Sequence, residues 1–148
     1  MSQLKPNAVL EFGAAFGASG MYWLARLSLY NRGKMYSFEP NEIWNPIARS
    51  NFGTVSDWHV LTLGTFEDNI GLIKEKVNIA LIDAIHTRDF VLKQFEVVSR
   101  VVDKGALVLF DDINFSDDMK ACWSEISQSG MFASVWQLSS RVGIVELP

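Results

Sequence analysis

The sequence predicts an α/β fold built on a doubly wound, mostly parallel sheet, and two observations lead to this prediction. Short apolar runs rich in branched residues alternate with longer segments of helical period, which is typical of parallel strands joined by crossover helices. The runs are continuously apolar, so each strand is expected to be buried on both faces. The five runs are residues 8–12, 35–38, 58–62, 78–82 and 106–110.

The segments between these runs carry apolar residues at helical spacing, which predicts crossover helices with one face toward the core. After the fifth run, Gly130 is expected to stop the last of these helices. The expected core faces are Met21, Leu24 and Ala25, then Phe66, Ile70 and Ile73, then Val91, Phe95, Val98 and Val102, and finally Met119, Cys122, Trp123 and Ile126.

The C-terminal tail contains two further strand-like runs, residues 132–138 and 142–147. Residues 139–141 between them are too few for a crossover helix, so these runs are expected to form an antiparallel hairpin. The prediction is therefore a seven-stranded sheet with helices on both faces, in one domain over residues 1–148.

Length, charge and cysteine content restrict the function. The 148 residues suit one domain, and 13 basic against 17 acidic side chains give a net charge of −4 with no basic cluster, which disfavours a nucleic-acid partner. The longest uncharged apolar stretch, residues 12–25, is shorter than the ~20 residues of a membrane span. Cys122 is the single cysteine, and the N-terminus does not follow the plan of a signal peptide, so a cytoplasmic protein is expected.

Ligands of open α/β sheets bind beyond the carboxyl ends of the strands, so the residues that follow each run matter most. The first run leads into a turn containing Gly13 and Gly17, where the backbone can bend tightly and a ligand can approach. Glu39 ends the second run, about 20 residues further on, where a carboxylate can accept both hydroxyls of a ribose. A nucleoside-bearing ligand is the preferred interpretation, and an ordinary turn with an exposed glutamate is the alternative.

The third run leads into Thr65 and Phe66, which could flank an adenine. Thr65 serves equally well as a helix N-cap and Phe66 as a core residue, so both interpretations stay open. His59, inside the third run, is interpreted as a packing or surface residue.

Three carboxylates and one imidazole follow the fourth and fifth runs: Asp83, His86, Asp111 and Asp112. Titratable groups gathered at one sheet edge repel one another and shift their pKa values, which is typical of a functional site. The alternative is structural, with Asp83 or Asp112 capping turns and His86 starting the next helix.

These residues together resemble a class I S-adenosylmethionine-dependent methyltransferase, in particular the small-molecule O-methyltransferase-like group of the methyltransferase family 24 type. The resemblance covers nearly the whole chain. It rests on the order and spacing of Glu11, Gly13, Gly17 and Ser19 in an E-x-G-x-x-x-G-x-S motif, Phe38-Glu39-Pro40, and the segments 82–86 and 105–113.

The resemblance implies a Rossmann-like sheet whose last strand is antiparallel, and S-adenosylmethionine as the cofactor. It places Glu11, Gly13, Gly17 and Ser19 around the methionine end of the cofactor, Glu39 on the ribose, Thr65 and Phe66 near the adenine, and Asp83 near the reacting centre. In the cation-dependent O-methyltransferases that the chain resembles, three acidic positions hold a divalent metal. Here they are Asp83, Asp111 and Asp112, whose oxygens suit Mg²⁺, Ca²⁺ or Mn²⁺.

Two features depart from the family pattern. Ala15 stands where many methyltransferases have a third glycine, and only about seven residues precede the first strand, whereas relatives usually have lid helices there. We therefore expect a single methyltransferase domain without N-terminal lid helices.

The sequence hypothesis is O-methylation of a small hydroxylated acceptor, with His86 as the general base and a divalent metal assisting. The first alternative is a nicotinamide-dependent oxidoreductase, since Ala15-x-Gly17-x-x-Gly20 resembles a dinucleotide fingerprint without its first glycine. The second is a non-catalytic interaction module of the same fold. Trp44 and Trp136 are hypothesised to contact the acceptor or a second copy in a homo-oligomer.

Overall fold

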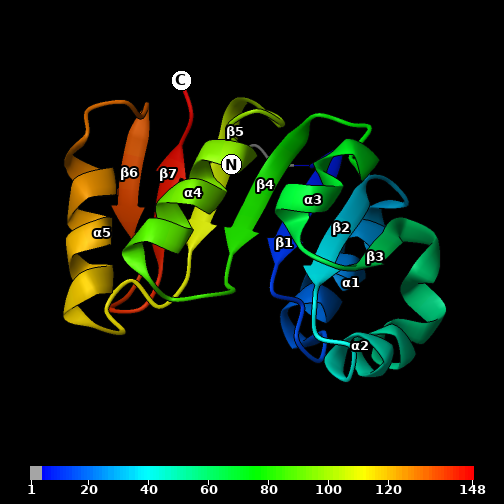
Figure 1. The fold of residues 1–148 in the computed structure, drawn as a ribbon. Coiled ribbons are helices and arrows are strands. Elements are labelled where there is room, and N and C mark those ends of the chain that lie inside the picture. The colour runs from blue at the N-terminus through cyan, green and yellow to red at the C-terminus, as the bar shows by residue number, and fades with distance from the viewer. Residues whose placement is uncertain (1–4) are drawn as a thin grey trace.

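The computed structural model describes residues 5–148, and of residues 54–56 it describes the backbone alone. Strands and helices alternate along this part of the chain until the final hairpin (Figure 1). The strands are β1 Ala8–Phe12, β2 Lys34–Glu39, β3 His59–Leu63, β4 Val77–Ile82, β5 Val102–Phe110, β6 Ser134–Gln137 and β7 Gly143–Glu146. The helices are α1 Ala18–Tyr30, α2 Trp44–Phe52, α3 Phe66–Asn69, α4 Arg88–Val98 and α5 Asp117–Gln128, with the 3-10 turns η1 Gly53–Trp58 and η2 Ile70–Leu72.

In the described chain the strands form one seven-stranded sheet of order β3-β2-β1-β4-β5-β7-β6. Neighbouring strands from β3 to β5 are parallel, whereas β7 runs antiparallel to both β5 and β6. This arrangement confirms the predicted fold class, including the C-terminal antiparallel hairpin.

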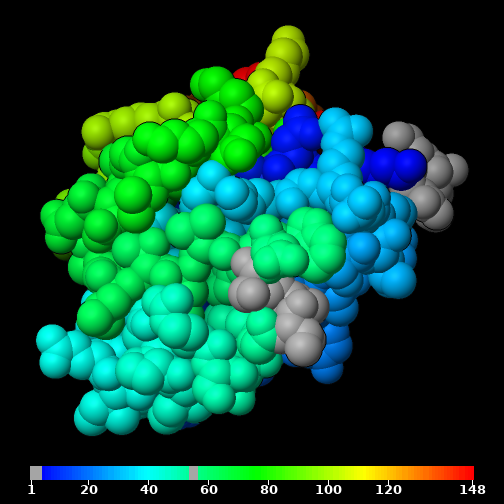
Figure 2. Space-filling model, turned by 90° about the vertical axis from the view of Figure 1, so that its right-hand side faces the viewer, coloured from blue at the N-terminus to red at the C-terminus, as the bar shows by residue number. Residues whose placement is uncertain are grey.

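The register of the central strands brings their carboxyl ends to the same level. Phe12 of β1 pairs with Phe38 of β2 and with Ile82 of β4, and Ile82 pairs with Phe110 of β5. The residues that follow these four positions therefore form a row along one edge of the sheet. The arrowheads of the parallel strands in Figure 1 point toward this edge, at the end of the molecule where α2 lies. Figure 2 shows the molecule from the β3 side, with the cyan α2 segment at the bottom.

Helices cover the sheet on both faces, each over its own apolar cluster. On one face α3, α4 and α5 pack on the larger cluster, which includes Phe12, Phe38, Phe66, Phe110 and Val145. On the other face α1 and α2 pack on a smaller cluster. Its buried members are Val9, Leu24, Leu27, Met35, Ala48, Phe52 and Ile79.

Of the stripe predicted for α1, Leu24 is buried as expected, whereas Met21 and Ala25 are wrong. Gly20, Leu24 and Leu27 are the buried residues of the helix, whereas Met21 is 38% exposed and Ala25 is exposed as well. A Cβ on Gly20 would lie 2.8 Å from the Phe52 ring. The face of α1 that carries Gly20 therefore packs closely against Phe52 of α2. Apolar periodicity overlooks such a contact because glycine has no side chain to count.

The other predicted stripes fit better. Met119, Cys122 and Ile126 of α5 are buried as expected. In the α4 stripe, Val102 is wrong, because the helix ends at Val98 and Val102 is the first residue of β5. The stripe that starts at Phe66 belongs to a short helix followed by the η2 turn. None of the helices in the described residues is long and apolar enough to cross a membrane.

Candidate functional site

The site is a row of residues that follow adjacent strands. Three backbone hydrogen bonds extend the sheet ladder past the strand ends: Gly13 N–H donates to Phe38 O (3.1 Å), Asp83 N–H to Phe12 O (3.2 Å) and Asp111 N–H to Ile82 O (3.1 Å). The structure thus brings Gly13, Glu39, Asp83 and Asp111 to one edge, where the sequence places them.

The loop after β1 lies directly against the end of β4. Gly13 has φ +82°, and a Cβ there would lie 2.1 Å from the carbonyl oxygen of Asp83. Ala15 also takes a positive φ of 45°. Only glycine fits the first of these positions, because both the backbone conformation and the close approach exclude a side chain.

Glu11 is fully buried beneath this loop. Its Oε1 accepts a hydrogen bond from Ser19 Oγ (2.5 Å) and its Oε2 one from Ser37 Oγ (2.8 Å). Burial raises the pKa of the Glu11 carboxyl, and this effect outweighs the two serine hydrogen bonds, which lower it. Glu11 and Ser19 fix the start of α1 against β1 and β2, and they do not line the cavities described below.

His59 extends this buried network. Its Nε2 lies 2.9 Å from Ser37 Oγ, and its ring meets the Phe52 ring edge-on with 4.1 Å between centroids. Burial, followed by the positive charge of Arg49, lowers the pKa of His59 to about 4. This environment agrees with the interpretation of His59 as a packing residue.

Glu39 is buried at the end of β2, with both carboxylate oxygens beside the loop. Oε2 accepts from the Ala15 N–H (2.7 Å) and Oε1 from the Asn41 N–H (2.9 Å). Each carboxylate oxygen has two lone pairs, so Glu39 retains acceptor capacity for a ligand. An open cavity of about 310 Å³ begins here, lined by Gly13, Ala15, Glu39, Pro40, Asn41, Trp44, Asp83, Ala84 and Ile85.

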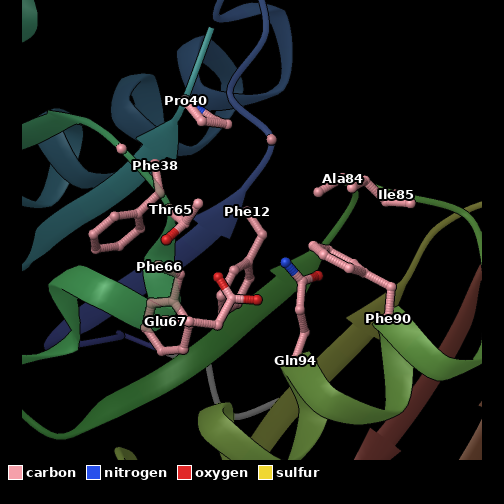
Figure 3. Close-up of a pocket in the computed structure, with 12 residues that line it drawn as sticks. Phe12, Phe38, Pro40, Thr65, Phe66, Glu67, Ala84, Ile85, Phe90 and Gln94 are labelled. Carbon is pink, nitrogen blue, oxygen red and sulfur yellow. The ribbon is translucent and has the colours of Figure 1, made fainter.

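A second, mostly apolar cavity of about 160 Å³ adjoins the first (Figure 3). The two share Gly13, Pro40, Ala84 and Ile85. The other lining residues are Phe12, Phe38, Gly64, Thr65, Phe66, Glu67, Phe90 and Gln94.

Two buried acceptor atoms in this apolar cavity have no partner among the described residues: Glu67 Oε1 and Gln94 Oε1. Figure 3 shows Glu67 of α3 and Gln94 of α4 extending toward each other across the space. A buried acceptor without a donor is costly, so these atoms are suited to a ligand that brings N–H or O–H groups. The sequence reasoning missed both residues. A glutamine between Val91 and Val98, on the core face of a predicted helix, could have indicated a buried polar group that needs a partner.

Thr65 and Phe66 satisfy both interpretations that the sequence left open. Thr65 caps α3 by accepting from the Asp68 N–H, and it also lines the apolar cavity. Phe66 is 1% exposed, belongs to the larger apolar cluster, and forms part of the cavity wall.

The acidic cluster lies beside the first cavity. Nε2 of His86 lies 3.4 Å from Asp112 Oδ2 and 3.9 Å from Asp83 Oδ1, and its ring packs against Phe115. Burial, followed by the negative charge and hydrogen bond of Asp111, raises the pKa of Asp83 to about 7. The four predicted residues of this cluster therefore lie together.

Arg141 is the residue of this cluster that the sequence reasoning missed. It lies in the loop of the β6–β7 hairpin, and its Nε and Nη2 donate to Oδ1 (2.8 Å) and Oδ2 (2.5 Å) of Asp111. Its Nε also lies 2.9 Å from Asp112 Oδ1. Burial acts to raise the pKa of Asp111, but the hydrogen bonds and charge of Arg141 hold it below its ordinary value.

A third cavity of about 230 Å³ opens on the other side of the cluster. It is lined by Asp112, Asn114, Phe115, Ser140 and Arg141. Asp112 takes a positive φ of 50°, which is unusual for a residue with a side chain. Because His86 contacts Asp83 of the first cavity and Asp112 and Phe115 of the third, it stands between the two.

The predicted metal ligands do not form a metal site in this structure. Among the described residues there is no group of three or more His, Cys, Asp or Glu side chains that could hold a metal ion. Asp111 and Asp112 instead pair with the Arg141 guanidinium. The divalent cation therefore stays a prediction from the resemblance.

The two tryptophans singled out from the sequence lie in different places. Trp44 lines the first cavity beside Glu39, and its ring is tilted against that of Phe16 with 5.5 Å between centroids, whereas Trp136 is half-exposed on β6. Their expected contacts with an acceptor or a second copy stay predictions.

Solved structures of known proteins share this fold. The chain is similar to the O-methyltransferase from Bacillus cereus in complex with SAH, with 18% identity, a TM-score of 0.79, and 97% of this chain and 75% of that chain covered. It is also similar to TomG from Streptomyces achromogenes, an O-methyltransferase involved in tomaymycin synthesis solved in complex with SAM, with 14% identity, a TM-score of 0.77 and coverages of 97% and 74%. The SAH-bound methyltransferase PaMTH1 from Podospora anserina gives 12% identity, a TM-score of 0.77 and coverages of 97% and 73%.

Sequence comparison adds the family relationship. Curated protein sequences gave no significant match. A family model described as a methyltransferase domain matches residues 10–113, which run from within β1 to the loop after β5 and include the loops that carry the row of site residues. The chain therefore belongs to the methyltransferase domain family.

Proposed function

We propose that the chain is an S-adenosylmethionine-dependent O-methyltransferase that acts on a small hydroxylated acceptor. The observation that carries this proposal is the pair of adjoining cavities along the strand ends, with the Glu39 carboxylate in the open one and unpaired acceptors in the apolar one. Together they match the three chemically distinct parts of the cofactor: an aromatic base, a sugar diol and a charged amino-acid end.

The apolar cavity suits the adenine ring. Phe12, Phe38 and Phe66 offer aromatic surface, and Ile85 and Phe90 close the opposite side. The unpaired Glu67 Oε1 and Gln94 Oε1 would accept hydrogen bonds from the exocyclic amino group, which would relieve the unfavourable burial of these atoms.

The open cavity suits the ribose and the methionine end. Glu39 would accept hydrogen bonds from the two ribose hydroxyls, in addition to those from Ala15 and Asn41. Beyond the ribose the cavity passes Gly13 and reaches Asp83. Glu11 and Ser19 would act from beneath, by holding the glycine loop in place for the methionine end.

S-adenosylmethionine supplies a methyl group on a positively charged sulfur, and the transfer forms an O–C bond while the C–S electron pair returns to sulfur. The chain must align the acceptor oxygen with this methyl group and remove the hydroxyl proton. His86 would accept that proton on its imidazole and later release it to water. Its position favours this role, because the Asp112 carboxylate, 3.4 Å away, stabilises the positive charge that the ring gains, and Asp83, 3.9 Å away, adds to this when it is ionised.

Calorimetric titration of the purified chain with S-adenosylmethionine, S-adenosylhomocysteine and NAD⁺ tests the proposal. Micromolar binding of the two sulfur nucleosides without NAD⁺ binding is expected. NAD⁺ binding alone would favour the oxidoreductase, because Glu39 could hold either ribose. Binding of none of the three would overturn the proposal.

A turnover assay separates the enzyme from a non-catalytic module. The chain is incubated with S-adenosylmethionine and a panel of small phenols, hydroxy acids and sugars, and formation of S-adenosylhomocysteine is measured. If the chain is the proposed enzyme, at least one class of compound raises the rate of S-adenosylhomocysteine formation above the rate without an acceptor. A chain that binds the cofactor and transfers nothing would support the module.

A further inference from the structure

We propose that the guanidinium of Arg141 is the fixed positive charge of the acceptor site, and that it takes the place of a divalent cation in this chain. This inference rests on the proposed function. It makes Arg141 a residue of the reaction that no motif of the sequence indicates, and it predicts methyl transfer without a metal.

The ion-pair geometry fixes the guanidinium. Two of its nitrogens face the two oxygens of Asp111, at 2.8 Å for Nε and 2.5 Å for Nη2, which is the paired geometry that makes arginine–carboxylate contacts strong and directional. The Asp111 side chain is only 10% exposed. A nearly buried carboxylate strongly favours a retained counter-ion, so Asp111 holds Arg141 in place.

The same contacts compete with a metal. Asp112 Oδ1 lies 2.9 Å from Nε, so the guanidinium already faces oxygens of both aspartates after β5. A divalent cation bound to those oxygens at its usual ~2.0–2.6 Å would lie within about 5 Å of the guanidinium carbon or nitrogens. Like charges at that separation repel each other, although solvent weakens the repulsion because the Arg141 side chain is 62% exposed. The cation and Arg141 therefore compete for the same oxygens.

The free side of the guanidinium faces the third cavity. Arg141 lines that cavity with Phe115 and Ser140, and its Nη1 has no hydrogen-bond partner in the described part of the chain. His86 does not line this cavity itself, but it contacts two residues that do, Asp112 and Phe115. An acceptor oxygen placed there would meet a proton acceptor on one side and a fixed positive charge on the other. The guanidinium would stabilise the negative charge that develops on that oxygen as its proton leaves.

Manganese titration followed by electron paramagnetic resonance tests the proposal without an acceptor. We compare the wild type, Arg141→Ala, Arg141→Gln and the matched control Arg100→Ala, which breaks a 2.6 Å ion pair with Glu96 on the distant end of α4. S-adenosylhomocysteine affinity is measured on every variant. The wild type and Arg100→Ala are expected to show no Mn²⁺ binding at the site at Mn²⁺ concentrations up to about 1 mM, which is the weak end of protein cation-site affinities. Arg141→Ala and Arg141→Gln are expected to gain one site that binds Mn²⁺ at least about tenfold more tightly.

Stoichiometric Mn²⁺ binding to the wild type would overturn the proposal, and so would neutral Arg141 variants that gain no Mn²⁺ site. Two neutral variants are used so that the comparison with the wild type survives if one of them fails to fold. Failure of the proposed function is recognised separately, because it would appear as absent S-adenosylhomocysteine binding in the wild type whatever the Mn²⁺ result.

Discussion

The Glu39 carboxylate accepts a 2.7 Å hydrogen bond from the backbone N–H of Ala15, and this contact ties the end of β2 to the loop after β1. The same carboxylate therefore shapes the loop and borders the open cavity. In the proposed function, ligand binding and loop geometry thus depend on one side chain, and a change at Glu39 is expected to affect both.

Replacing Glu39 by Gln is expected to weaken S-adenosylhomocysteine binding at least about tenfold, because hydrogen bonds to a charged acceptor are worth roughly 1.5–3 kcal/mol. Calorimetry measures the affinity. Glu42→Gln is the matched control, since Glu42 is exposed three residues further on and the charge change is the same. Equal affinities in the two variants would remove Glu39 from the binding site.

Replacing His86 by Ala is expected to lower kcat by roughly 10²–10⁴, the usual contribution of a general base. The affinity for S-adenosylhomocysteine is expected to stay within about twofold, because His86 does not line either proposed nucleoside cavity. The two quantities are measured with an acceptor found in the panel and by calorimetry. Undiminished turnover would show that another group takes the proton.

Gly13→Ala and Gly105→Ala form a matched pair that separates backbone strain from close approach. Both glycines have a positive φ, +82° and +72°, but a Cβ on Gly13 would meet the Asp83 carbonyl at 2.1 Å whereas one on Gly105 has nothing within 4 Å. Gly105→Ala is expected to lower the free energy of unfolding by about 1–2 kcal/mol, the cost of a side chain in the left-handed region. Gly13→Ala is expected to lower the free energy of unfolding clearly more than this, and also to abolish S-adenosylhomocysteine binding. Urea unfolding measures the stability, and calorimetry measures the binding. Equal losses of stability would mean that the end of β4 moves aside freely.

His59 is expected to make stability depend on pH in the acid range. Its pKa is about 4 in the folded chain, while an unfolded histidine titrates near ~6.5. Between these values the unfolded state binds the proton and the folded state does not, so stability is full above pH ~6.5 and falls as the pH falls toward 4.

Urea unfolding at pH 7 and pH 5 checks this expectation. The wild type should lose about 2 kcal/mol more than His59→Asn between the two pH values, on the basis of 1.36 kcal/mol per pKa unit. The raised pKa values of Glu11 and Asp83 act in the opposite direction, but both proteins share them, so they cancel in the comparison. Parallel pH profiles would contradict the buried neutral state of His59.

The row Gly13, Glu39, Asp83 and Asp111 could be predicted from the sequence because it needs only local information. Continuous apolar runs locate the strands, and helical segments between them make the strands parallel, which places every strand end at one edge. The register that aligns Phe12, Phe38, Ile82 and Phe110 then follows from the fold class.

Arg141 could not be predicted in the same way. Its place depends on the antiparallel register of β5 with β7, in which Phe110 faces Gly143, and this brings the hairpin loop beside Asp111. This register is decided by the packing of all three strands at that end of the sheet. From the sequence alone, the three loop residues therefore predict only a turn. Part of the α1 stripe was missed for a similar reason, because the phase of the helix depends on the contact between Gly20 and Phe52.

The aromatic wall of the apolar cavity is also the centre of the protein's core. Phe66 meets Phe12 and Phe38 edge-on, with ring centroids 4.2 Å and 5.3 Å apart, and all three rings are almost fully buried. Any substitution that reshapes this end of the site must repack the core at the same time, whereas Phe115, Ser140 and Arg141 lie in loops at the other end. The two ends of the site are thus unequally free to diverge. If the proposed function holds, relatives can change the acceptor by altering loops, whereas the nucleoside end is inherited together with the fold.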